Sequence, residues 1–225
     1  VTKEWWLGKC LLNNSNYTRV MGFYTNKNDK IAILLVGLPG SGKSSWANEF
    51  RKSHPDFTII SMDKIVEREA QTHGLIVEGV NPYPCVAGVA KARFVRNLTS
   101  VVSSSSNFVV DRVNGSIQRR KYILDKLDAS WKTIAVIFDA SPEMCRDRIE
   151  ERFKKDGRKV DTFDDIVGYF NPPKDGFDLI VHVDPVGKTK SCKACTKIGA
   201  ELQRKLFPKE KGKGDSIPLG IPFLP

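Results

Sequence analysis

The sequence lacks any apolar run that approaches the roughly 20 residues needed to cross a bilayer. Of its 225 residues, 40% are hydrophobic and 28% are charged, which is an ordinary composition for a soluble globular protein. This length suits one α/β domain with extensions better than two independent domains. We therefore expect a soluble protein without a membrane partner, whose oligomeric state the composition leaves open.

A secretory leader is also lacking, and the segment opens with Val1 rather than Met, so we expect a processed product or an excised domain. Cysteine is scarce, with five scattered residues, an odd number that is typical of reduced thiols rather than a disulfide framework. Cys192 and Cys195 form a lone CxxC pair with no nearby histidine, which favours two incidental thiols over a zinc site. The cysteine pattern predicts an intracellular protein, in the nucleus or the cytoplasm.

Negative charge is in short supply, because the chain has 36 Lys and Arg, 26 Asp and Glu, and a formal net charge of +10. The excess is concentrated in residues 188–213, where nine Lys and Arg face two Glu, a net +7. Such a run attracts polyanions through Coulomb forces and counterion release, so nucleic acid is a natural partner. A solvated, solubilising tail is an equally good interpretation of the run taken alone.

Short apolar runs alternate with longer amphipathic ones from residue 31 onward, a pattern typical of parallel strands joined by crossover helices. The pattern predicts a three-layer α/β P-loop fold with a five-stranded, mainly parallel sheet. Residues 1–30 are expected to be a lead-in, residues 31–185 the P-loop domain, and residues 186–225 a basic tail. The predicted strands are 31–36, 57–60, 107–111, 133–138 and 179–183, and the predicted helices are 43–53, 63–73, 84–103, 116–128, 142–155, 162–170 and 190–206.

A phosphate-binding loop is predicted where the first apolar run ends, because GLPGSGKSS matches GxxxxGK[ST] at every defined position. The glycines let successive backbone N–H groups point at a phosphate, and the N-terminus of the next helix adds a positive field. Lys43 is expected to bridge the β- and γ-phosphates of ATP or another NTP, and Ser44 to offer its hydroxyl to Mg²⁺. The predicted nucleotide-binding residues are Gly37, Gly40, Ser41, Gly42, Lys43, Ser44 and Ser45.

Asp63 and Asp111 each lie at the carboxyl end of a predicted strand, where open α/β sheets place their binding sites. Asp63 comes just after FTIIS and is a candidate base, although a carboxylate in the first turn of a helix is also favoured by the helix dipole alone. Asp111 ends FVVD and is a candidate for organising Mg²⁺ or the substrate, with a capping role as the alternative.

Two arginines, Arg148 and Arg152, lie four residues apart and therefore on one helix face. One interpretation is an arginine-rich lid over the triphosphate. The other is a surface helix held by salt bridges to Glu150 and Glu151.

The order of the motifs GLPGSGKSSWANEF, SMDKIVERE, VVDRVNGSIQRRKYIL and FDASPEMCRDRIEER resembles the P-loop polynucleotide 5′-kinase-like family. That family includes the bacteriophage-type polynucleotide kinase domain, the kinase-like domains of RNA-end repair proteins and the N-terminal domain of myelin cyclic-nucleotide phosphodiesterase. The QRRK run is especially similar to the P-loop domain of heterogeneous nuclear ribonucleoprotein U. The resemblance covers about residues 31–185.

This resemblance implies that Asp63 activates a 5′-hydroxyl and that Arg148 and Arg152 stabilise the transferred phosphate. It also implies that Asp111, Asn114 and Arg119 face the substrate. The sequence departs from the phage pattern at Val66, where the family has an arginine that holds the acceptor phosphate; Arg68 or Arg112 could take over that role. A second departure is Val113, which replaces a threonine.

Three functions are consistent with these patterns. The first is an ATP-dependent 5′-hydroxyl polynucleotide kinase, with RNA a more natural acceptor than DNA. The second is an RNA-binding protein whose P-loop domain holds a nucleotide without catalysing transfer. The third, a small-metabolite kinase, is less attractive because a small acceptor gains little from a +7 extension.

Overall fold

The structure is a computed structural model, and it describes residues 29–75, 80–156 and 162–184. The predicted lead-in up to residue 28 and the predicted basic tail, with its helix 190–206 and the CxxC pair, lie outside the described residues. The extents predicted for these two extensions therefore stay predictions.

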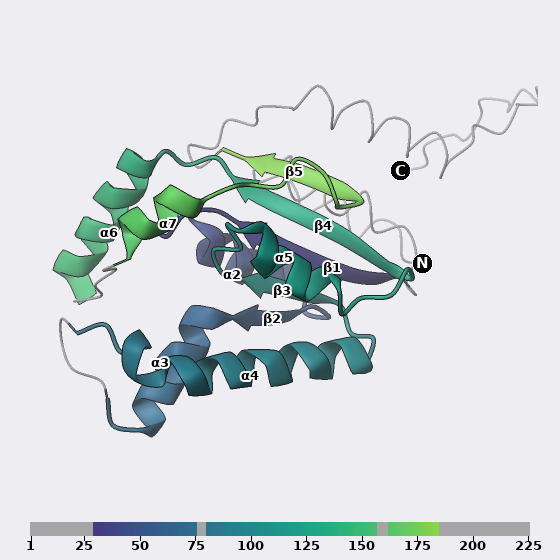
Figure 1. The fold of residues 1–225 in the computed structure, drawn as a ribbon, viewed down its shortest axis with the longest axis horizontal. Coiled ribbons are helices and arrows are strands. Elements are labelled where there is room, and N and C mark those ends of the chain that lie inside the picture. The colour runs from purple at the N-terminus through teal and green to yellow at the C-terminus, as the bar shows by residue number, and fades with distance from the viewer. Residues whose placement is uncertain (1–28, 76–79, 157–161, 185–225) are drawn as a thin grey trace, which may run out of the picture. The chain divides into compact units, whose positions relative to one another are not determined.

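The described strands form one five-stranded sheet in the order β2-β3-β1-β4-β5, and every neighbouring pair is parallel. The predicted three-layer α/β fold is confirmed, and the sheet is entirely rather than mainly parallel. Because all strands run the same way, their carboxyl ends gather at one edge, beside α6 and α7 in Figure 1. The strands are β1 (Lys30–Val36), β2 (Thr58–Ser61), β3 (Phe108–Asp111), β4 (Trp131–Phe138) and β5 (Leu179–Val183).

The helices of the described residues begin and end within two residues of the predicted bounds, with one exception. Helix α5 ends four residues early because the chain turns there, with Lys126 N donating to Ile123 O and Leu127 N to Leu124 O. None of the helices in the described part of the chain has the length and apolarity to cross a bilayer. They are α2 (Lys43–Ser53), α3 (Met62–Thr72), α4 (Tyr83–Ser103), α5 (Ile117–Leu124), α6 (Pro142–Asp156) and α7 (Phe163–Tyr169).

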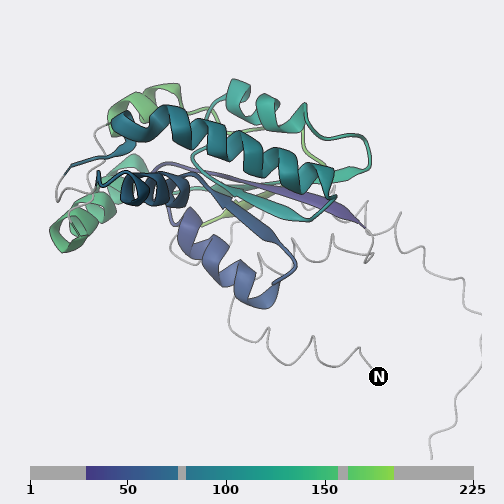
Figure 2. The ribbon, with the colours of Figure 1, turned by 90° about the horizontal axis from the view of Figure 1, so that it is seen from below.

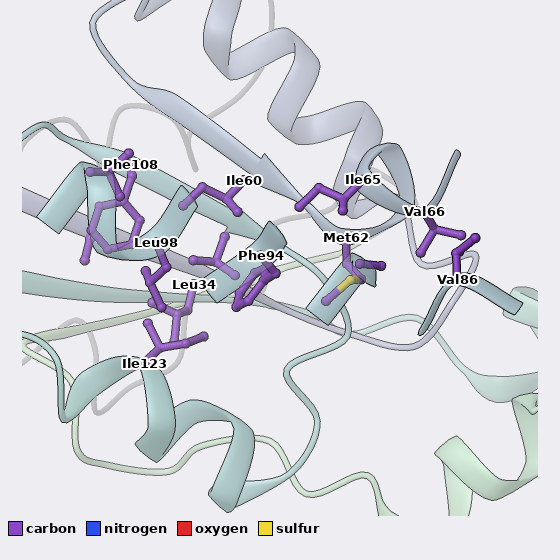
Figure 3. Close-up of a cluster of buried hydrophobic side chains, with 14 of the residues drawn as sticks. Leu34, Ile60, Met62, Ile65, Val66, Val86, Phe94, Leu98, Phe108 and Ile123 are labelled. Carbon is purple, nitrogen blue, oxygen red and sulfur yellow. The ribbon is translucent and has the colours of Figure 1, made fainter. Parts of the chain in front are cut away.

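Helices cover both faces of the sheet, with α4 and α5 on one side and α2 on the other (Figure 2). Six of the seven residues of β1 are buried, as expected of a continuous apolar strand covered on both faces. On the α3 and α4 side, Leu34, Ile60, Phe94, Leu98 and Phe108 belong to one buried cluster (Figure 3). This cluster fixes α3 and α4 on the strands whose ends carry the predicted acidic residues.

A smaller apolar cluster lies under α6 and α7 and consists of Leu38, Cys145 and Phe163. Leu38 belongs to the loop between β1 and α2, and Cys145 belongs to α6. This cluster therefore packs the glycine-rich loop against the helix that carries the two predicted lid arginines.

Candidate active site

The glycine-rich loop between β1 and α2 has the backbone geometry of a phosphate cradle. Gly40 and Gly42 have φ values of 80° and 99°, a left-handed region that glycine enters without steric cost. A Cβ added to Gly40 would lie 2.7 Å from the backbone oxygen of Cys145, so α6 leaves no room for a side chain there. Gly37 N donates to Val113 O at 3.2 Å, which ties the start of the loop to the end of β3.

Lys43 is buried, and its Nζ donates to Leu38 O at 2.6 Å and to Ser41 Oγ at 3.3 Å. Burial lowers the pKa of Lys43 from 10.5 to about 8, while the negative charges of Asp111 and Asp63 act in the opposite direction. A desolvated ammonium that binds oxygens of the loop itself is poised to accept an anionic phosphate.

Asp63 is the second residue of α3, and its side chain is exposed at the carboxyl edge of the sheet. Its charge raises the pKa of Lys43 and also that of Arg112, so it lies within electrostatic reach of both cations. Asp63, from α3, thus lies within electrostatic reach of the lysine of the phosphate loop, and its role as a base stays a prediction.

Asp111 is buried at the end of β3, where Ser61 Oγ donates to its Oδ2 at 3.0 Å. The two residues are in register across the parallel pair of β2 and β3, so the fold fixes the orientation of the carboxylate. After burial itself, Asp111 has the largest effect on the pKa of Lys43. The role of Ser61 was not predicted, because the sequence does not show which strands pair.

Two of the ligand types that usually hold Mg²⁺ are present near Lys43. Ser44 is half-buried next to Lys43 on α2 and would supply a hydroxyl, and Asp111 would hold waters of the ion's shell. Across the described residues, no group of three or more His, Cys, Asp or Glu could hold a metal without substrate. This set fits Mg²⁺, which prefers to be held jointly by a few protein oxygens and substrate phosphates.

Asn114 has a structural position in the turn after β3. It is fully buried with φ at 46°, and its Nδ2 donates to Leu35 O at 2.8 Å. Arg120 Nη1 donates to Asn114 O at 3.0 Å and to Asn171 O at 2.8 Å. Asn114 thus braces the turn against β1, and its predicted contact with substrate stays a prediction.

Arg119 lies on α5, and its Nη1 donates to Tyr169 Oη of α7 at 2.7 Å. Its guanidinium carbon lies 5.0 Å from the centroid of the same ring. Arg112 lies next to Asp111 in the chain, and its guanidinium carbon lies 5.0 Å from the centroid of the Phe94 ring. Burial lowers the pKa of Arg112, and the positive charge of Arg119 lowers it further.

The two arginines of α6 both interact with the phosphate loop, one by a hydrogen bond and one through its charge. Arg148 Nη1 donates to Gly40 O at 3.4 Å, and the charge of Arg152 lowers the pKa of Lys43. Both side chains are half-buried. The structure thus places them beside the loop, whereas their role as a lid over a bound triphosphate stays a prediction.

A parallel sheet in this order, with a glycine-rich phosphate loop after its central strand, defines a P-loop α/β domain of the kinase type. The AAA domain family model matches residues 33–173, more than half of the chain, so the chain belongs to this family.

Heterogeneous nuclear ribonucleoprotein U-like protein 2 of Mus musculus is 29% identical to the chain over 189 residues, which are 80% of this chain and 25% of the relative. The human protein of the same name is 28% identical, with the same coverage. The chain thus spans about a quarter of the length of the curated relatives that it matches.

A solved structure of a candidate kinase from Chloroflexus aurantiacus matches 82% of this chain and all of its own, with a TM-score of 0.57. At 15% sequence identity, this similarity shows a shared fold and nothing about substrate.

Proposed function

We propose that this domain transfers the γ-phosphoryl group of ATP to the 5′-hydroxyl of a polynucleotide. The observation that carries the proposal is that the buried Lys43 of the phosphate loop lies within electrostatic reach of two carboxylates, Asp111 at the end of β3 and Asp63 at the start of α3. A cation in a phosphate loop serves nucleotide binding, and an exposed carboxylate beside it serves an acceptor that must lose a proton.

The residues divide the reaction between them. The loop N–H groups and Lys43 hold the β- and γ-phosphates, and Asp63 accepts the proton of the acceptor hydroxyl. As that O–H bond breaks, the oxygen bonds to the γ-phosphorus and the bond between this phosphorus and the β-phosphate oxygen breaks, releasing ADP. Arg148 and Arg152 neutralise the charge that spreads over the transferred group, and Asp111 fixes the site around it.

A magnesium ion held near Ser44 would add charge neutralisation at the phosphates when it is bound. The proposal otherwise depends on three features of the domain itself. These are the burial of Lys43, the orientation of Asp111 by Ser61, and the close packing of α6 on Gly40.

RNA is the preferred acceptor in this proposal, for two independent reasons. The matched relatives are named as ribonucleoprotein-like proteins. The basic run at 188–213, outside the described residues, carries a net +7 that favours a polyanion. An intracellular protein of the nucleus or cytoplasm would meet such an acceptor.

A second candidate function is nucleotide-dependent RNA binding without transfer. The observation that favours it is Val66, which is buried in the core at the place where the phage-type resemblance implies an arginine for the acceptor. A P-loop domain that lost its acceptor site would keep ATP as a structural or regulatory ligand.

The deciding experiment measures transfer of labelled γ-phosphate from ATP, with Mg²⁺, onto 5′-OH RNA and 5′-OH DNA oligonucleotides. Wild-type protein should label RNA better than DNA, and Lys43→Ala should weaken ATP binding and abolish labelling. If wild type labels neither oligonucleotide while it still binds ATP and RNA, the second function replaces the first. If a small metabolite is labelled and oligonucleotides do not compete, both are wrong.

A further inference from the structure

Arg112, directly after β3, and Arg119, on α5, lie within electrostatic reach of each other, and the charge of Asp63 acts on Arg112. Among the residues that the structure describes, neither Arg112 nor Arg119 has an acidic side chain within salt-bridge distance. By contrast, the half-buried Arg93 pairs with Glu69, with Nε and Oε1 2.9 Å apart. Two neighbouring like charges repel each other, and an anionic ligand would relieve that repulsion.

The fold holds both guanidinium groups by contacts that leave donors for a ligand. Arg112 lies over the Phe94 ring, a contact that uses the face of the guanidinium and none of its N–H groups. Arg119 donates to Tyr169 Oη, which uses one of five N–H donors. A guanidinium fixed in this way presents a planar fork that matches two oxygens of a phosphate.

Asp63 acts electrostatically on both the phosphate loop and one arginine of this pair. Its charge acts on Lys43 of the phosphate loop and on Arg112, which follows the carboxyl end of β3. A base that serves phosphoryl transfer must reach the acceptor hydroxyl while the donor phosphate is held nearby. An acceptor whose hydroxyl reaches Asp63 would bring its first phosphate near the cations on which that carboxylate acts, and Arg112 is one of them.

We propose that Arg112 and Arg119 bind the first internucleotide phosphate of the 5′-hydroxyl acceptor, with Tyr169 holding Arg119 in place. This inference rests on the proposed function, since it names the group that positions the acceptor at Asp63. In this proposal, the two arginines replace the acceptor-binding arginine that the phage-type resemblance implies on α3, where this chain has the buried Val66.

The test uses the first linkage of the acceptor as the probe. Dissociation constants are measured for a 5′-OH RNA oligonucleotide and for the same oligonucleotide with a neutral methylphosphonate at its first linkage. Wild-type protein should bind the methylphosphonate form roughly tenfold more weakly, because a charge-assisted contact is lost. A methylphosphonate at an internal linkage serves as the control for general loss of charge. Matching 5′-OH DNA oligonucleotides show whether the contact depends on the sugar.

Arg112→Gln and Arg119→Gln should each bind the natural oligonucleotide roughly tenfold more weakly and lose most of the sensitivity to the first linkage. Lys121→Gln removes one positive charge from the same helix α5, at an exposed residue paired with Asp125, and should keep the full sensitivity. Arg112→Lys keeps the charge without the fork and should fall between wild type and Arg112→Gln.

The inference is wrong if wild-type protein treats both oligonucleotides alike. It is also wrong if folded Arg112→Gln and Arg119→Gln, checked by ATP binding, keep the sensitivity to the first linkage. A loss of affinity that is equal for first and internal linkages would overturn it too, since it would show only general charge attraction. If no γ-phosphate is transferred but the first-linkage effect appears and vanishes in both variants, the arginine site stands and the kinase function fails.

Discussion

The two sides of the proposed active site are specified very differently by the sequence. On the nucleotide side, the loop at 37–42 and Lys43 form one contiguous motif whose geometry follows from its glycines. On the acceptor side, the candidates Asp63, Arg112 and Arg119 come from three separate segments. The phosphate cradle is thus formed by one short segment, whereas the acceptor site is formed by residues that lie far apart in the sequence.

This difference teaches where function can change within one fold. In the cradle, Gly40 and Gly42 are required by their positive φ values, and Gly40 also by the close approach of α6, so a change at either residue affects nucleotide binding directly. A change on the acceptor side can be offset from another helix, because several elements end at the same edge. Val66 stands where the phage-type resemblance implies an arginine on α3, and cations follow β3 and lie on α5, which fits this second behaviour.

The largest effect is expected from Asp63→Asn, which separates the two sides. Transfer should fall by about 10²- to 10⁴-fold, as for loss of a general base, while the dissociation constant of ATP stays within about threefold. Single-turnover transfer and equilibrium ATP binding measure the two quantities. Glu67→Gln, an exposed acidic residue of the same helix, is the matched control and should change neither. Full activity in Asp63→Asn would remove the assigned base.

Val66→Arg sharpens the comparison by reintroducing the phage-type arginine. Because Val66 is buried in the α3 and α4 core, the substitution should destabilise the domain by about 2–4 kcal/mol without lowering the KM for the acceptor. Urea unfolding and steady-state kinetics provide the two measurements. Glu67→Arg, at the next and exposed position, should be nearly neutral for stability. A stable Val66→Arg with a lower acceptor KM would place the acceptor site on α3 instead.

Gly40→Ala tests how tightly the nucleotide side is built. The new Cβ would lie 2.7 Å from Cys145 O at a φ of 80°, so a stability loss of about 1–3 kcal/mol is expected, together with weaker ATP binding. Gly88→Ala is the control, since α4 leaves open space there and helix propensity predicts a gain of roughly 0.5–1 kcal/mol. Thermal unfolding of both variants distinguishes a strained loop from a general intolerance of added methyl groups.

The smallest effect concerns pH. The pKa of Lys43 is about 8 in the free domain, and bound phosphates stabilise its protonated form, so ATP affinity should be constant just below pH 8. Above pH 8 the affinity should fall by up to tenfold per pH unit, because binding must then supply the missing proton. Calorimetric titration between pH 7.5 and 9.5 measures this. Lys43→Arg, charged throughout, should show a flat profile; an equally flat wild-type profile would contradict a lowered pKa for Lys43.

Sequence patterns predicted the fold well because each element has its own local signal. The start and end of α2 were predicted to the residue, since a glycine-rich loop precedes it and a charged, proline-containing stretch follows. The end of α5 was missed by four residues because the turn after Leu124 depends on backbone bonds rather than on a helix-breaking residue. The partners of the site side chains were missed for a similar reason: Ser61 and Asp111 are fifty residues apart.

The sequence by itself determined the phosphate loop, the α/β class and the identity of the acidic candidates, because these depend on short motifs and on the alternation of apolar runs. Only the tertiary structure decided that Asp111 is held by Ser61, that Asn114 braces a turn, and that Arg119 rests on Tyr169. The physical reason is that burial and charge are properties of the assembled sheet edge. The pKa of Lys43 and the pairing of two arginines exist only once distant segments share that edge.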